Sequence, residues 1–121
     1  MDRLFFVAGS LFAFFAVALG AFAAHGLKTR LAPDMLATFE TAVRYHMYHA
    51  LALLGVAWAI SHWPESKAYL AGWAFIFGIV VFSGSLYILS TTGIRWLGAF
   101  TPIGGAGFLI GWILLVWAVW R

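Results

Sequence analysis

The chain has 121 residues, of which 64% are hydrophobic and only 9% are charged, and its formal net charge is +3. A chain of this length cannot bury so much apolar surface around a core of its own, so the composition excludes a water-soluble globular domain and predicts that lipid surrounds the protein. The absence of Cys excludes disulfides, thiolate metal sites and cysteine nucleophiles, and the cationic residues are spread along the loops without forming a patch that would bind nucleic acid.

The first apolar segment covers residues 4–24, which is long enough for one membrane-spanning helix. Such a run near the N-terminus could also be a secretory signal peptide. The apolar part of a signal peptide is usually only about 7 to 15 residues long, and three more apolar segments follow here, so we favour a permanent helix.

The second predicted helix covers residues 34–60, with Asp34 as its N-cap. Its uninterrupted apolar part is short, because it extends only over residues 50–60. A helix needs about 20 residues to cross the hydrocarbon core, so this span must include polar residues. Counting back from the end of the helix places the membrane boundary near Thr41.

Four ionisable residues lie at or inside that boundary: Glu40, Arg44, His46 and His49. The same count places Glu40 at the interface and His49 about 12 Å inside it, close to the midplane. An ionisable group at the centre of a membrane helix costs about 2.5 to 3.5 kcal/mol, so its presence there marks a candidate functional site.

The third and fourth predicted helices cover residues 68–90 and 102–120, and Thr101 with Pro102 supplies an N-cap and a first-turn proline for the fourth. We therefore predict an all-α protein, an antiparallel four-helix transmembrane bundle forming one domain over residues 1–121. We call the end of the bundle with the first and third connections face B, and the end with both termini face A.

Polar side chains are concentrated in the face B half of the predicted bundle. Counting the helical rise places residues 83–87 at the same depth as residues 44–49, and the first helix ends at this face. The predicted polar cluster therefore consists of His25, Glu40, Arg44, Tyr45, His49, Ser83, Ser85 and Tyr87.

Glu40 and Arg44 are four residues apart and share one face of the helix. They could form an interfacial salt bridge, with the long Arg side chain reaching towards lipid phosphates. Alternatively, Glu40 could be a buried carboxylate that carries a proton or holds a cationic ligand.

His46 and His49 have a spacing that could serve zinc or haem. No further ligand is expected at their depth, however, so we expect neither a metal nor a cofactor. A neutral His49 imidazole bonded to Ser83, Ser85 or Tyr87 on the neighbouring helix is the favoured interpretation.

Two other motifs are compatible with chemistry but do not require it. Ser83 and Ser85 lack the Gly-x-Ser-x-Gly context and the acidic partner of a hydrolase, and we expect no catalytic residue. The glycine-rich helix start at 101–107 could receive a phosphate or a lipid headgroup, or could simply be a closely packed first turn.

Small residues recur every three or four positions in the first and fourth segments, where they would let helix backbones approach closely. This spacing could serve packing within one bundle or contacts between copies in an oligomer or a larger membrane complex. The stripes include Gly9, Ala13 and Gly20 in the first segment and Gly104, Gly107 and Gly111 in the fourth.

Four sequence blocks occur in order along the chain: GAFAAHGLK at 20–28, YHMYHALAL at 45–53, FSGSLY at 82–87 and TPIGG at 101–105. Together they resemble the family known as domain of unknown function 423, which includes the bacterial inner-membrane protein YgdD and looks related to the mitochondrial transmembrane protein 256. The resemblance covers nearly the whole chain and implies a four-helix protein of the bacterial plasma membrane, without an activity to transfer. The family pattern often has Gln where His46 stands, which argues against His46 as an essential ligand or proton donor.

We therefore expect a non-enzymatic integral membrane protein whose partners include membrane lipids. Its polar cluster could serve an accessory, scaffold or lipid-binding role. A small transporter or channel is the alternative, and a quinone-binding or haem-binding protein is a third class.

Overall fold

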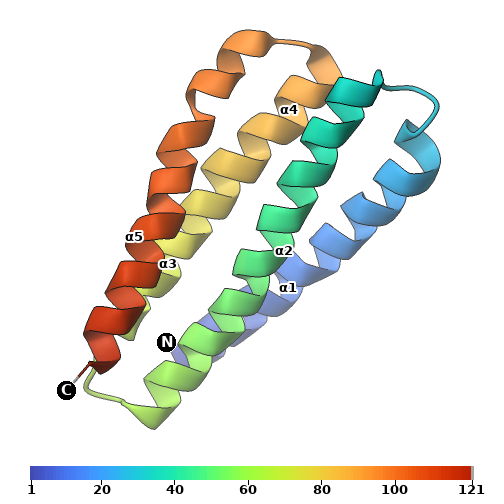
Figure 1. Cartoon of the computed structure of the whole chain (residues 1–121). Coiled ribbons are helices and arrows are strands. Elements are labelled where there is room, and N and C mark those ends of the chain that lie inside the picture. Colours follow the sequence, from blue (N-terminus) through green and yellow to red (C-terminus); the bar gives the residue numbers. More distant parts are fainter. Residues whose placement is uncertain (121) are drawn as a thin grey trace.

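The computed structural model describes residues 1–120, which form helices joined by short connections (Figure 1). Helices α3 and α4 continue into one another through a π turn, so the chain makes four long helical stretches that run antiparallel to their neighbours in sequence. The predicted helix ranges lie within a few residues of the observed ones. The elements are α1 (Asp2–Phe22), the π turn η1 (Ala23–Leu27), α2 (Pro33–His62), α3 (Ala68–Gly78), the π turn η2 (Ile79–Ser83), α4 (Gly84–Thr92), the 3-10 turn η3 (Arg95–Ala99) and α5 (Thr101–Val119).

Three of the long stretches are long and apolar enough to cross a membrane, namely Asp2–Leu27, Ala68–Thr92 and Arg95–Val119. The 30-residue helix α2 is longer than any of them but is not in this set, because its first half carries the ionisable residues described above. The all-α architecture with four long helices is thus as predicted, and length and composition support membrane crossing for three of the four.

Both predicted helix caps are wrong. Helix α2 begins at Pro33 with Ala32 at the N-cap, and Asp34 lies inside the first turn, with its carboxylate 3.9 Å from the Arg95 guanidinium. Thr101 is already helical, and its hydroxyl lies 2.8 Å from that of Ser85 on α4. In both cases the helix begins at or before the predicted cap residue, so that residue lies in the first turn and its side chain contacts another element.

The largest cluster of buried hydrophobic residues lies between the helices, mainly in the face A half, and a smaller one lies at face B around Leu27 and Phe39. The largest cluster is built on Phe5, Leu53, Val56 and Phe75, whose side chains are fully buried. Helix α1 can approach α2 closely because Gly9 has no side chain: a Cβ there would lie 2.8 Å from the Ala50 carbonyl oxygen and 3.0 Å from the Leu53 Cβ.

The glycines of α5 pack in the same way against α3 and η2. A Cβ on Gly104 would overlap the Phe82 backbone, and one on Gly111 would lie 2.6 Å from the Phe75 ring. Gly107 is likewise buried, against Phe77 and Ala74. Ala13 and Gly20 of the α1 stripe are half-buried, and Gly20 faces Val43 of α2. Of the two uses left open for these stripes, the structure therefore shows packing within one chain.

Candidate functional site

His49 is a buried imidazole with both ring nitrogens hydrogen-bonded. Its Nδ1 lies 2.8 Å from the Tyr45 backbone oxygen, and the Trp112 indole N–H donates to its Nε2 at 3.1 Å. Because the carbonyl can only accept and the indole can only donate, the proton resides on Nδ1 and the ring is neutral. The ring also stacks on Phe108, with centroids 3.6 Å apart and planes 9° apart.

The partners expected for His49 on the third predicted helix are therefore wrong, since its real partner is Trp112 on α5. Trp112 stands near the middle of α5, away from both helix ends where interfacial tryptophans gather. The mid-helix position of Trp112 is the feature of the sequence that could have indicated this contact, because an indole N–H at mid-membrane depth needs an acceptor within the protein.

His46 points to a different neighbour, although it is only three residues away. Its Nδ1 lies 2.8 Å from the Tyr87 hydroxyl, and its ring packs edge-on against Phe12 of α1 at 5.8 Å. Its Nε2 is buried without a hydrogen-bond partner among residues 1–120. A Gln amide could make a hydrogen bond to Tyr87 too, so the family pattern is compatible with a structural hydrogen bond at this position.

The two serines of the predicted cluster hold helices together. The fully buried Ser83 donates from its Oγ to the Ala42 carbonyl oxygen of α2 at 2.8 Å. Ser85 Oγ lies 2.9 Å from the Phe82 carbonyl oxygen and 2.8 Å from the Thr101 hydroxyl at the start of α5. Neither serine is bonded to a histidine, so no nucleophile–base pair forms here.

Three other residues of the predicted cluster lie on the surface. His25 is exposed and bonds its own helix, at the Ala21 carbonyl oxygen. Glu40 and Arg44 are exposed, so the alternative of a buried Glu40 carboxylate is wrong. The salt bridge between them is wrong too, because over residues 1–120 no carboxylate lies within 4.0 Å of Arg44. Arg44 instead donates from Nη2 to the Thr41 hydroxyl at 3.0 Å.

The metal hypothesis has no geometric support in residues 1–120. No three His, Cys, Asp or Glu side chains gather there as a metal site would need. His46 and His49 also face opposite neighbours, Tyr87 on one side and Trp112 on the other.

The cluster predicted from depth is thus divided into interhelical hydrogen bonds and a charged surface. The cavity that contacts part of this cluster is a lateral groove. It lies between α2 and α5, which flank α3 and α4 in Figure 1, and its volume is about 610 Å³. Of the predicted residues, only Tyr45 and His49 line it. The full lining is Thr41, Tyr45, Tyr48, His49, Phe82, Gly105, Phe108, Leu109 and Trp112.

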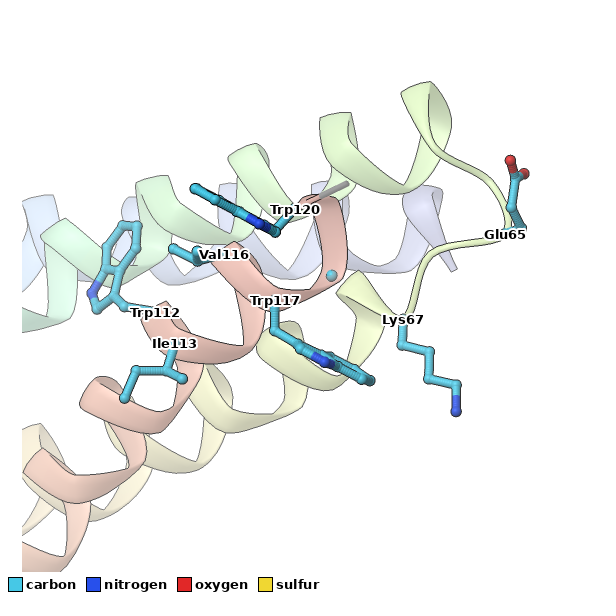
Figure 2. Close-up of a pocket in the computed structure, with 8 residues that line it drawn as sticks. Glu65, Lys67, Trp112, Ile113, Val116, Trp117 and Trp120 are labelled. Atoms are coloured by element: carbon cyan, nitrogen blue, oxygen red, sulfur yellow. The ribbon is translucent and has the colours of Figure 1, made fainter.

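A second, larger cavity of about 810 Å³ lies around the end of α5 at face A. Figure 2 shows that Trp117 and Trp120 project to different sides of α5, while Glu65 and Lys67 point away from the helices. Its polar groups do not converge on a common point, as they would in a binding site, and the exposed indoles suit the membrane interface.

Comparison with known proteins agrees with the membrane character of the fold. The family model described as "Protein of unknown function (DUF423)" matches residues 19–105. The chain is 48% identical to a UPF0382 membrane protein of Staphylococcus saprophyticus, with 94% of each chain covered. It is also 48% identical to the UPF0382 membrane protein YwdK of Bacillus subtilis, again over 94% of each chain.

No solved structure matches the chain. Its bacterial relatives and its three helices able to cross a membrane identify it as an integral protein of the bacterial plasma membrane, as expected from the sequence.

Proposed function

The chain belongs to the DUF423 family, and from its own geometry we propose that it is a non-enzymatic lipid-binding membrane protein that holds one apolar lipid chain in the groove between α2 and α5. The observation that carries this proposal is the groove itself. It is open to the side of the bundle and is lined mainly by aromatic and aliphatic side chains. Its volume of about 610 Å³ is typical of small-molecule sites.

The proposal requires that α2 be a fourth membrane span. Helix α2 has 30 residues, which corresponds to about 45 Å of helix, more than the roughly 30 Å of the hydrocarbon core. It packs along α1, and short connections join it to two helices that can span the membrane. A helix held antiparallel between two such helices crosses with them, and its polar first turns then reach the headgroup region at face B.

The deep part of the groove suits hydrocarbon because it offers no unused polar atom on His49. Tyr45 and Trp112 occupy both nitrogens of that ring, and its face lies on Phe108. A charged or polar ligand would have to displace these bonds, whereas an acyl chain needs only contact with the ring walls.

The rival functions have less support. A transporter or channel needs a polar path that continues towards face A, and none of the buried polar residues in 1–120 lies nearer to that face than His49. A scaffold that binds partners through its small-residue stripes would need those stripes exposed, yet Gly9, Gly104 and Gly111 already pack inside the chain.

Filling the groove tests the proposal. A Cβ on Gly105 would meet only the Phe82 ring, at 3.8 Å, so Gly105→Leu should fit the fold and occupy the groove. Gly55→Leu is the matched control, because Gly55 is exposed on α2 and has no atom within 4 Å of its Cβ position.

Native mass spectrometry from mild detergent measures retained lipid in each purified protein. We expect one lipid on the wild type and on Gly55→Leu, and its loss from Gly105→Leu. Leu109→Trp, at a second groove position with an exposed side chain, should reproduce that loss. Equal retention by all four proteins, or no lipid on the wild type, would overturn the proposal.

A further inference from the structure

The groove has a charged group at its face B end. Thr41 lines the groove, and Arg44 donates from Nη2 to the Thr41 hydroxyl oxygen at 3.0 Å. That hydroxyl in turn donates its own proton to the Ala37 carbonyl oxygen, also at 3.0 Å. Thr41 therefore accepts from Arg44 with a lone pair and holds the guanidinium beside the mouth of the groove, with its other N–H groups unoccupied by this contact.

No carboxylate of residues 1–120 neutralises this guanidinium. Glu40, one turn away, is not within 4.0 Å of it, and Asp34 is the partner of another cation, Arg95. Arg44 also lies a short distance inside the boundary inferred near Thr41, where a guanidinium without an anion is costly. The geometry leaves an anion-binding position directly above an apolar groove.

The charge of face B also favours an anionic occupant. The cations Lys28, Arg30, Arg44 and Arg95 outnumber the acidic residues Asp34 and Glu40 at this end. Anionic lipids are attracted to such a cationic membrane-facing surface, and a planar guanidinium can bind two phosphate oxygens at once.

At the opposite end of the groove, at about mid-membrane depth, a hydrogen bond joins its two walls. The Trp112 indole reaches across from α5 to His49 on α2, and Phe75 packs against the same indole with ring centroids 4.9 Å apart. From Thr41 to His49 the helical rise is about 12 Å, so the groove is as deep as the face B leaflet alone.

We infer that the occupant of this groove is an anionic phospholipid of the face B leaflet, with its phosphate on Arg44 and part of one acyl chain between α2 and α5. The inference rests on the lipid-binding function proposed above and specifies its ligand. Thr41 is the residue that positions Arg44, and the bond between Trp112 and His49 limits how deep the chain reaches.

Lipid competition tests the headgroup. The full chain is reconstituted in nanodiscs with equal amounts of phosphatidylglycerol and phosphatidylethanolamine carrying identical acyl chains, and native mass spectrometry reports which lipid the released protein retains. We expect about fivefold enrichment of phosphatidylglycerol on the wild type, the factor expected from one cation near a membrane surface. Arg44→Gln should retain a lipid without this preference, and Arg44→Lys should keep part of it.

Two further variants make the test specific. Thr41→Val should weaken the preference although Arg44 is intact, because the guanidinium loses its acceptor. Lys28→Gln removes an exposed cation that does not line the groove, and should leave the preference unchanged.

The two proposals fail in different ways. A lipid retained without headgroup preference on the wild type, or with the same preference on Arg44→Gln, overturns the inference about the ligand and leaves the groove proposal intact. A wild type without lipid, or a lipid that Gly105→Leu does not displace, overturns the lipid-binding function itself. A stable dimer that retains no lipid would likewise overturn both.

Discussion

The hydrogen bond from Trp112 to His49 gives the most direct test of how α2 and α5 are joined. Trp112→Phe removes the indole N–H that donates to the His49 Nε2 at 3.1 Å and keeps an aromatic ring beside Phe75. His49 is only 5% exposed, so water cannot readily replace the lost donor.

The expected cost follows from the environment of that nitrogen. Leaving a buried acceptor without a donor costs about 1 to 3 kcal/mol in water-soluble proteins. Interhelical hydrogen bonds in membranes average about 0.6 kcal/mol and reach about 1.7, because the unfolded chain finds other partners. The stack of His49 on Phe108 remains in the variant, so we expect a loss of about 1 kcal/mol in the free energy of unfolding.

Unfolding in mixed micelles with increasing SDS, followed by circular dichroism, measures this loss. Trp117→Phe is the control, because Trp117 is 57% exposed on the same helix and makes none of the side-chain hydrogen bonds found over residues 1–120. This substitution should change the free energy of unfolding by less than about 0.5 kcal/mol. In a double-mutant cycle with His49→Phe, the two losses should not add. Additive losses, or a Trp112→Phe variant as stable as the control, would refute the role given to this bond.

Three further substitutions test other contacts by the same unfolding assay. His46→Gln should cost less than about 1 kcal/mol because an amide can keep the bond to Tyr87, whereas His46→Leu should cost about 1 to 3; equal losses would show that the bond is unimportant. Gly104→Leu should lower the free energy of unfolding by about 1 to 3 kcal/mol or more, because the new Cβ meets the Phe82 backbone. Gly84→Leu should be nearly neutral, because no atom lies within 4 Å of its Cβ position. Similar stability of the two variants would contradict the packing described. Ser83→Ala should lose about 0.6 kcal/mol with the bond to the Ala42 carbonyl, and an unchanged midpoint would mean that this bond adds nothing to stability.

Part of the candidate site could be predicted by counting residues. The helical rise placed His49 near the midplane and placed residues 83–87 near its level, and the structure does bring His46 and Tyr87 together. The count could not identify which histidine would meet which partner. The count gave the depth of each side chain but not the direction in which it points, and the π turn at Ile79–Ser83 interrupts the regular α-helical spacing on which such a count depends.

The expected salt bridge between Glu40 and Arg44 shows a second limit. A spacing of four residues establishes that two side chains can meet on one helix, but not that they do. In the structure the Thr41 hydroxyl, one turn before Arg44, takes up the guanidinium instead. An exposed ion pair contributes little to stability, so a hydrogen bond to a nearby neutral acceptor can form in its place.

The sequence by itself determined the class and the plan of this protein: an all-α membrane protein with helices close to the predicted ranges and polar residues in the face B half, because segment length and hydropathy decide which stretches can be helices in lipid. Only the tertiary structure decided how the helices face one another. The contacts of Gly9 on α2 and Gly104 on Phe82 fix the rotation and spacing of neighbouring helices, and these in turn place Trp112 against His49 and open the groove beside them. Such contacts depend on residues far apart in the chain, so no local pattern along α2 or α5 could have predicted them.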